Sequence, residues 1–173
     1  MATMRKLFDE EQIARRVEAL AAEIAKSLPR DLALVVILKG GFVFAADLMR
    51  ALDRAGRVLR IEFLRLSSYG DAVDSSGLVR PIGPMPDDVA GRDVLIVDDI
   101  VDTGRSLVAA RSLLLSCGAA SISTCSILDK PSRREVEVEV DFVGFTIEDV
   151  FVVGYGMDFA DQHRHLPYIG TID

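Results

Sequence analysis

The sequence of 173 residues lacks the features that direct a chain to a membrane or out of the cell. Its first ten residues contain no apolar stretch of the kind found in a secretory signal peptide. No uninterrupted apolar run approaches the roughly 18 residues that a membrane-spanning helix needs. The two cysteines, Cys117 and Cys125, form neither a CxxC redox pair nor a four-ligand metal set. We therefore expect a cytoplasmic protein with reduced, buried thiols and no membrane partner.

The sequence also has fewer basic than acidic residues. Lys and Arg number 20 against 27 Asp and Glu, which gives a formal net charge of −7. Proteins that bind nucleic acid through its backbone use Lys and Arg to neutralise phosphates, so a nucleic-acid partner is not expected. A small phosphorylated substrate remains possible, because a local anion site can lie inside an acidic shell.

Repeats, low-complexity tracts and linker-like changes of composition are absent as well. A chain of this length buries roughly 70% of its unfolded surface without disulfides or metals. We therefore expect one domain over residues 1–173.

Two common phosphate-binding motifs are missing. There is no GxxxxGK[ST], which excludes a P-loop, and no GxGxxG, which excludes the dinucleotide fingerprint. A phosphoryl-aspartate enzyme would place Asp-x-Asp after a strand, whereas this chain has Asp-Asp-x-x-Asp.

What the sequence does contain is an alternation of apolar strands and amphipathic helices. Asp9 is placed to cap a helix whose apolar positions recur every three or four residues until Pro29. Alternation of this kind predicts an α/β fold with a mainly parallel sheet. The expected strands cover residues 33–38, 58–66, 94–97, 121–128, 135–143 and 151–153. After the first helix, further helices are expected at 42–52 and 105–117. The C-terminus is expected to be loop-like.

A long segment rich in Ser, Gly, Asp and Pro, residues 67–86, separates the second and third expected strands. Loops of this length in compact domains are often lids or binding loops. Composition alone leaves a lid and simple disorder equally open.

The most informative segment follows the strand at 94–97. Asp98 and Asp99 come first, then Asp102, then a Thr-Gly turn that opens a helix. A helix start offers unpaired N–H groups and a positive dipole end, which suit a phosphate. Carboxylates beside a phosphate usually hold ribose hydroxyls or magnesium. The segment therefore indicates a ribose 5-phosphate site, the alternative being a solvated acidic turn.

Segments in the same order along nearly the whole chain resemble the type I phosphoribosyltransferases. The acidic segment resembles the phosphoribosyl-pyrophosphate loop of the superfamily. Lys130 and the C-terminal segment resemble the narrower hypoxanthine-guanine branch. The matching segments are 38–41, 68–69, 97–106, 129–130 and 151–164.

The resemblance implies a fold and an activity. The fold has a central, mainly parallel sheet flanked by helices, a small hood from the C-terminal segment at about 144–173, and a flexible lid loop at about 67–86 that includes Ser68 and Tyr69. The activity is purine salvage, in which 5-phosphoribosyl 1-pyrophosphate and hypoxanthine or guanine give IMP or GMP and pyrophosphate. Members of the family are commonly homodimers or homotetramers.

It also implies roles for the acidic segment. Asp102 would be the catalytic base that accepts the proton from purine N7. Asp98 and Asp99 would hold the ribose hydroxyls and, with Asp158, a magnesium ion. The 5′-phosphate would be cradled by Thr103, Gly104, Arg105 and Ser106.

Other residues would bind the remaining parts of the substrates. Lys39, Gly40 and Arg164 would bind pyrophosphate, with a cis peptide before Lys39. For the purine, the Lys130 ammonium would donate to O6, the Phe151 ring would stack on the base, and the backbone carbonyls of Val152 and Asp158 would face N1 and the 2-amino position. Without the resemblance, Lys130 is an ordinary surface lysine and Phe151 a core aromatic.

The chain departs from the family pattern at Asp98, where a Glu is usual, and Arg105 occupies a variable position. Two alternatives stay open. One is a xanthine or uracil phosphoribosyltransferase with the same acidic loop, which Lys130 and the C-terminal segment disfavour. The other is a non-catalytic RNA-binding regulator on this fold, which the net charge of −7 disfavours.

Overall fold

A six-stranded sheet forms the centre of the computed structural model, which describes residues 4–67 and 78–172. Its strand order is β4-β3-β2-β5-β6-β7, and all neighbours are parallel except β3 and β4. This confirms the expected α/β class with a mainly parallel sheet. The strands are β2 (Asp31–Leu38), β3 (Val58–Leu66), β4 (Pro81–Ile82), β5 (Asp93–Val101), β6 (Ser121–Asp129) and β7 (Phe142–Thr146).

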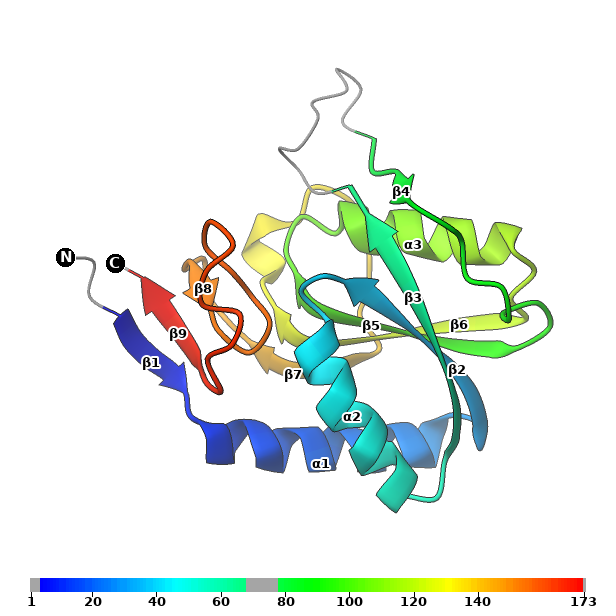
Figure 1. Ribbon diagram of the computed structural model, residues 1–173, viewed down its shortest axis with the longest axis horizontal. Helices are drawn as coiled ribbons and strands as arrows, with labels where there is room; N and C mark the ends of the chain where they lie inside the picture. Colours follow the sequence, from blue (N-terminus) through cyan, green and yellow to red (C-terminus); the bar gives the residue numbers. More distant parts are fainter. Residues whose placement is uncertain (1–3, 68–77, 173) are drawn as a thin grey trace.

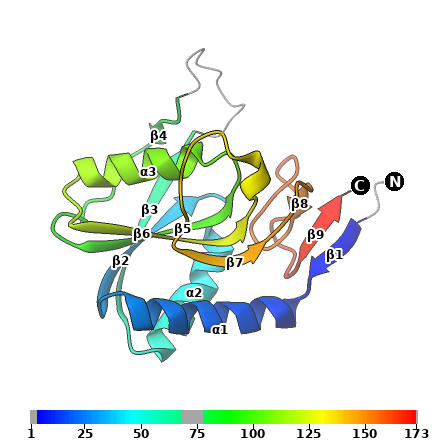
Figure 2. The ribbon, with the colours of Figure 1, turned by 180° about the vertical axis from the view of Figure 1, so that it is seen from behind.

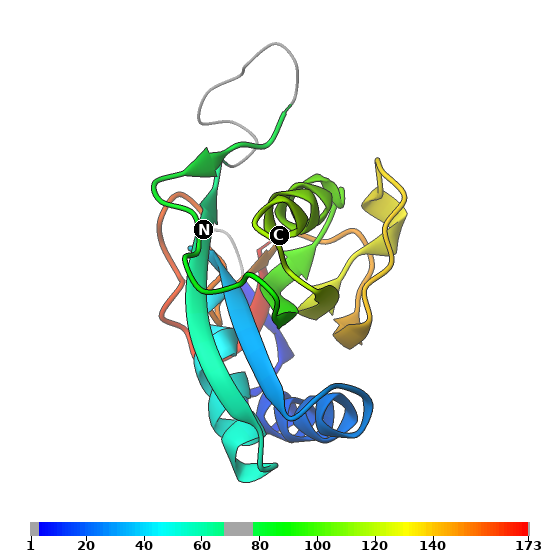
Figure 3. The same cartoon turned by 90° about the vertical axis from the view of Figure 1, so that its right-hand side faces the viewer.

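Helices cover both faces of this sheet. Helices α1 (Glu10–Ser27) and α2 (Phe42–Arg54) lie on one face and α3 (Arg105–Ser116) on the other (Figures 1 and 3). Side chains of β2 alternate accordingly, since Leu34 joins the core beneath α1 and α2 while Val35 joins the core beneath α3. A strand buried on both faces reads as a continuous apolar run, as this one does.

The first helix follows its sequence signals closely. The Asp9 side chain accepts a hydrogen bond from the Gln12 N–H at 2.8 Å, and the Gln12 side chain accepts one from the Asp9 N–H at 2.9 Å. This reciprocal capping box starts the helix, and Leu28, before Pro29, ends it. Within the described part of the chain, no helix is long and apolar enough to cross a membrane.

A second, three-stranded sheet joins the two ends of the chain. Its order is β1 (Met4–Phe8), β9 (Ile169–Ile172), β8 (Val152–Val153), and both pairings are antiparallel. The ends of the chain therefore lie side by side, away from the main sheet (Figure 2). We call this sheet and residues 154–168 the hood. The expectation of a loop-like C-terminus was wrong at β9, and β1 was not expected, because short strands that pair across the whole chain leave little local pattern.

Two further strand predictions need correction. Strand β5 continues past Val97 to Val101, so Asp98 and Asp99 lie on the strand rather than in a loop after it. The strand expected at 135–143 begins only at Phe142. Its alternation of acid and valine is real, since Val138 and Val140 pack against the core beneath α3, but the extended chain at 135–140 belongs to neither sheet.

Candidate active site

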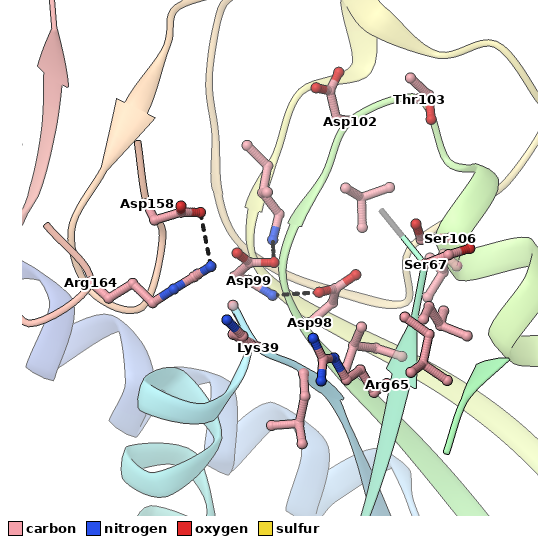
Figure 4. Close-up of a pocket in the computed structure, with 18 of the residues that line it drawn as sticks. Lys39, Arg65, Ser67, Asp98, Asp99, Asp102, Thr103, Ser106, Asp158 and Arg164 are labelled. Carbon is pink, nitrogen blue, oxygen red and sulfur yellow. Dashed lines mark hydrogen bonds and ion pairs between the residues drawn. The ribbon is translucent and has the colours of Figure 1, made fainter. Parts of the chain in front are cut away.

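The candidate site lies at the carboxyl ends of β2 and β5, which are neighbours in the sheet. The chain leaves β2 toward β3 on one side and leaves β5 toward β6 on the other. Such a switch point leaves a crevice where α/β proteins bind ligands. A cleft of about 550 Å³ lies there, and Figure 4 shows most of the side chains that line it.

The loop after β2 forms one wall of the cleft. The peptide bond between Leu38 and Lys39 is cis, as the resemblance implied. Gly40 passes so close to Asp99 that an added Cβ would lie 2.0 Å from the Asp99 Oδ2 atom. Only glycine allows the main chain to approach the carboxylate in this way. The N-terminus of α2 follows directly, so this loop brings backbone N–H groups to the same side of the cleft.

The two acids at the end of β5 occupy the floor of the cleft. Asp98 is 6% exposed, and its Oδ1 accepts a hydrogen bond from the Asp99 N–H at 2.9 Å. Burial, and then the adjacent Asp99 carboxylate, raise the pKa of Asp98 well above its ordinary value. Two carboxylates this close disfavour an anion and suit hydroxyl groups or a cation.

Magnesium fits this donor set in a particular way. Among the described residues, no group of three or more His, Cys, Asp or Glu is placed to hold a metal ion by itself. Mg²⁺ is usually bound through one or two carboxylates together with substrate phosphates and water. Asp98 and Asp99 provide such a carboxylate pair, whereas the Asp158 carboxylate is engaged by Arg164 at 3.0 Å.

The opposite end of the cleft is built around the start of α3. Gly104 has a φ of 87° and provides no side-chain cap, and the Arg105 N–H donates to Thr103 Oγ1 at 3.3 Å. The positive dipole end of α3 at this point suits an anion. Thr103 and Ser106 line the cleft here with their hydroxyls. Arg105 is not among the lining residues, and its Nε donates to Glu135 Oε2 at 2.6 Å. The geometry thus brings all the expected phosphate-cradle residues together except the Arg105 side chain.

Residues 133–136, which we call the clamp, hold the turn between β5 and α3. The Arg134 guanidinium donates to the main-chain oxygens of Val101 and Asp102, both at 3.0 Å. The N–H groups of Glu135 and Val136 point to the Thr103 oxygen, at 2.9 and 3.3 Å. At residues 135 and 136 these bonds take the place of pairing with a strand.

The clamp also reaches the expected catalytic base. Arg133 Nε lies 3.0 Å from Asp102 Oδ1. Sequence reasoning did not single out Arg133 or Arg134, although two adjacent arginines just after Lys130 in an acidic chain are a usable signal. Arg65, Ser67 and Asp161 also line the cleft and were missed.

The hood contributes cationic groups to the wall opposite α3. Arg164 pairs with Asp158 at 3.0 Å and donates to the Gly156 oxygen at 2.7 Å. Lys39 lies 3.6 Å from Asp161. Figure 4 shows Lys39 and Arg164 on one side of the cleft and Ser106 on the other, with Asp98 and Asp99 between them. The cleft therefore has an anion-binding end on each side of an acidic floor.

The expected purine-binding residues lie outside the lining of this cleft, apart from Asp158. Lys130 is buried, so the alternative that it is an ordinary surface lysine was wrong. Its ammonium donates to the Val150 oxygen at 2.8 Å. The ring of Phe151 is 52% exposed and meets Phe159 edge-to-face, with centroids 5.6 Å apart. Phe159 was not expected from sequence. Val152 is a buried residue of β8.

The expected lid is only partly described. Ser68 and Tyr69 lie outside the described residues. At the base of the segment, the Ser67 N–H donates to the Arg80 oxygen at 2.7 Å, and the Arg80 N–H donates to Ser67 Oγ at 2.9 Å. Ser67 and Ile82 line the cleft, so the base of this segment borders the site.

Comparison with known protein families gives a clear result. The model of the phosphoribosyl transferase domain matches residues 4–160. The chain belongs to the phosphoribosyltransferase family. Its fold is therefore that of a phosphoribosyltransferase.

Individual relatives narrow the comparison. This phosphoribosyltransferase is 42% identical to the hypoxanthine phosphoribosyltransferase of Escherichia coli K12, over 98% of this chain and 96% of the relative. It is 41% identical to the hypoxanthine-guanine phosphoribosyltransferase of Bacillus subtilis, over 96% and 91% of the two chains. A hypoxanthine-guanine phosphoribosyltransferase structure from Bacillus anthracis superposes with a TM-score of 0.90 at 35% identity, covering 98% of each chain.

Proposed function

We propose that this phosphoribosyltransferase works in purine salvage, transferring the 5-phosphoribosyl group of 5-phosphoribosyl 1-pyrophosphate to N9 of hypoxanthine or guanine. The single observation that carries the proposal is the cleft, in which groups that suit an anion lie on each side of an acidic floor formed by the buried Asp98 and the half-buried Asp99. A donor sugar with phosphates at C5 and C1 has the same order of groups. The relatives named above are hypoxanthine and hypoxanthine-guanine phosphoribosyltransferases, and neither of them supports a xanthine or uracil enzyme or an RNA-binding regulator.

The two ends of the donor would be bound differently. The 5′-phosphate would meet the N-terminus of α3 and the hydroxyls of Thr103 and Ser106. Pyrophosphate would meet Lys39 and the Gly40 main chain, with Arg164 turning from Asp158 to the leaving group. A guanidinium suits this exchange because it binds carboxylates and phosphates with the same fork of donors.

Asp102 would act as the base. As N9 bonds to C1 of the ribose and the bond to pyrophosphate breaks, purine N7 becomes more acidic, and a carboxylate at its edge accepts the proton. Asp98 and Asp99 would hold the ribose hydroxyls and magnesium, which when bound neutralises charge on the departing pyrophosphate. The shorter Asp98 side chain, where a Glu is usual, remains compatible with this role because it lies on the floor of the cleft.

The purine would lie against the hood beyond Asp102. The buried Lys130 ammonium would donate to O6, an interaction that adenine, with an amino group there, does not offer. The half-exposed ring of Phe151 would stack on the base, and Phe159 extends this aromatic surface. The carbonyls of Val152 and Asp158 would accept from N1 and the 2-amino group.

The assembly and location of the protein are part of the same proposal. We expect a homodimer or homotetramer, because the large apolar side chains of Phe42 and Phe63 are 45% and 53% exposed. Light scattering coupled to size-exclusion chromatography measures the assembly directly. A cytoplasmic location agrees with two cysteines that are free rather than paired.

A steady-state assay tests the substrate class. Pyrophosphate release is measured with the phosphoribosyl donor, Mg²⁺ and, in turn, hypoxanthine, guanine, xanthine and adenine. We expect turnover with hypoxanthine or guanine and little with adenine. Activity confined to xanthine, or to uracil in a further assay, would replace the proposed substrate.

The base is tested by Asp102→Ala. Loss of a positioned proton acceptor lowers turnover by about 10²–10⁴-fold, while nucleotide binding, measured by calorimetry with IMP, stays within about threefold because the α3 N-terminus is intact. Asp53→Ala, on the exposed side of α2, is the matched control and retains full activity. Wild-type rates in Asp102→Ala exclude the assignment.

A further inference from the structure

One charged group at the site has no role in the scheme above. Arg133 follows the purine-site lysine by three residues, in the short 3₁₀ turn Pro131–Arg133, and its Nε donates to Asp102 Oδ1 at 3.0 Å. The described contacts of the Asp102 side chain involve Oδ1 and leave Oδ2 to a ligand.

The ion pair has little value for stability. The side chains of Arg133 and Asp102 are 47% and 37% exposed, and ion pairs this exposed to solvent add little to stability. The Asp102 carboxylate, and then Asp149, raise the pKa of the Arg133 guanidinium, so it stays charged at any pH where the protein is folded. A permanent charge fixed to one oxygen of a carboxylate defines the direction of the other oxygen.

The same guanidinium connects Asp102 to the purine-site lysine. Arg133 NH1 lies 3.8 Å from Asp149 Oδ2, and Lys130 Nζ lies 3.8 Å from Asp149 Oδ1. The four side chains thus form a chain of alternating charge. N7 and O6 lie next to each other on one edge of a 6-oxopurine, so the two ends of this chain are the groups that would meet them.

We propose that Arg133 is a positioning residue, which holds Asp102 Oδ1 so that Oδ2 faces purine N7 in register with the Lys130 contact to O6. This inference rests on the proposed function, because it assigns Arg133 an effect on the proton transfer by Asp102. Arg133 itself touches neither substrate nor the reacting atoms. Its contribution is orientation, which acts on the chemical step and not on donor binding.

The test is a double-mutant cycle of Arg133→Gln and Asp102→Asn, with kcat and KM measured for hypoxanthine and the phosphoribosyl donor. In the wild-type background, Arg133→Gln lowers kcat about tenfold and leaves KM for the donor unchanged. In the Asp102→Asn background, Arg133→Gln causes no further loss, because no proton acceptor remains to be oriented. Coupled residues are non-additive in this way, whereas independent ones are additive.

Controls separate a loss of orientation at Asp102 from a general effect of removing an arginine or from unfolding. Arg15→Gln, which removes a surface pair with Glu11 on α1, leaves kcat unchanged, and thermal melts show that each variant folds. An unchanged kcat in Arg133→Gln, or an equal loss in both backgrounds, overturns the inference. A wild-type protein that does not turn over hypoxanthine overturns the proposed function instead, so the two failures are distinguishable.

Discussion

The main sheet and the hood line the same cleft with opposite kinds of structure. The sheet is continuous, with central strands whose side chains are buried on both faces. The hood pairs strands from the two chain ends and contains non-glycine residues with positive φ, namely Tyr155, Ala160, Asp161 and His163. The sheet places the acidic floor of the cleft, and the hood places Asp158 and Arg164 on its wall.

The difference shows how the site divides its tasks. Asp98 is buried and Asp99 is half-buried, and both lie on strand β5, which pairs with β6. Arg164, which we propose exchanges Asp158 for pyrophosphate, lies on a loop. The hood packs closely against the loop after β2, because a Cβ on Gly156 of the hood would lie 2.3 Å from the Gly40 oxygen.

The largest expected effect on stability is in the sheet. Leu95 of β5 is fully buried, and Leu95→Ala leaves a cavity that lowers the free energy of unfolding by about 2–5 kcal/mol. Below its melting temperature the variant keeps its KM values, because the cleft lies at the end of the strand. Chemical denaturation measures the change, and Leu115→Ala, at a side chain that is 51% exposed on α3, is the control with little effect. Equal losses in the free energy of unfolding in both variants would mean that the burial of a side chain does not determine how much it stabilises the protein.

The next effect is at the contact between the two parts. Gly156 has a φ of 99°, and Gly156→Ala meets both that conformation and the Gly40 oxygen. We expect a loss of about 1–3 kcal/mol with a rise of about tenfold or more in KM for the phosphoribosyl donor, because Gly40 lies in the proposed pyrophosphate loop. Gly56→Ala is the matched control, with a φ of 78° and nothing within 4 Å of the added Cβ. If both variants raise KM equally, the contact is irrelevant to the site.

The same division explains what could be predicted from sequence. Strand β3 was predicted at its observed bounds, and β2 and α2 to within two residues, because apolar runs and helix periods are local signals. The acidic segment was recognised because its residues are contiguous. Strand β1 was missed because its partner, β9, lies at the other end of the chain.

The clamp shows a second limit of prediction from sequence. The alternation at 135–140 predicts one face toward the core, which is correct, but alternation does not say whether a strand partner is present. Here the main chain bonds to Thr103 instead. The pairing of Arg133 with Asp102 depends on that tertiary contact, so no pattern within either segment predicts it.

The smallest effect concerns the tie between the hood and α2. The Tyr155 hydroxyl, on a side chain that is 4% exposed, donates to Asp47 Oδ2 at 2.5 Å. Tyr155→Phe removes this bond and lowers the free energy of unfolding by about 1–2 kcal/mol. Tyr168→Phe is the control, since among the described residues that hydroxyl donates to the weakly accepting sulfur of Met4 at 3.3 Å.

The pH dependence of this difference identifies its cause. Burial, and then the hydrogen bond to Asp47, raise the pKa of Tyr155 above its ordinary value. The folded protein therefore holds the hydroxyl proton more tightly than the unfolded chain does, and the stabilisation is complete below about pH 10, where an exposed tyrosine ionises. Above that pH the unfolded chain releases the proton first, so the advantage of the wild type over Tyr155→Phe shrinks as the pH rises. Urea denaturation between pH 8 and about pH 11 measures it, and a difference that stays constant over this range would mean that the Tyr155 hydroxyl is not buried in solution as it is in the structure.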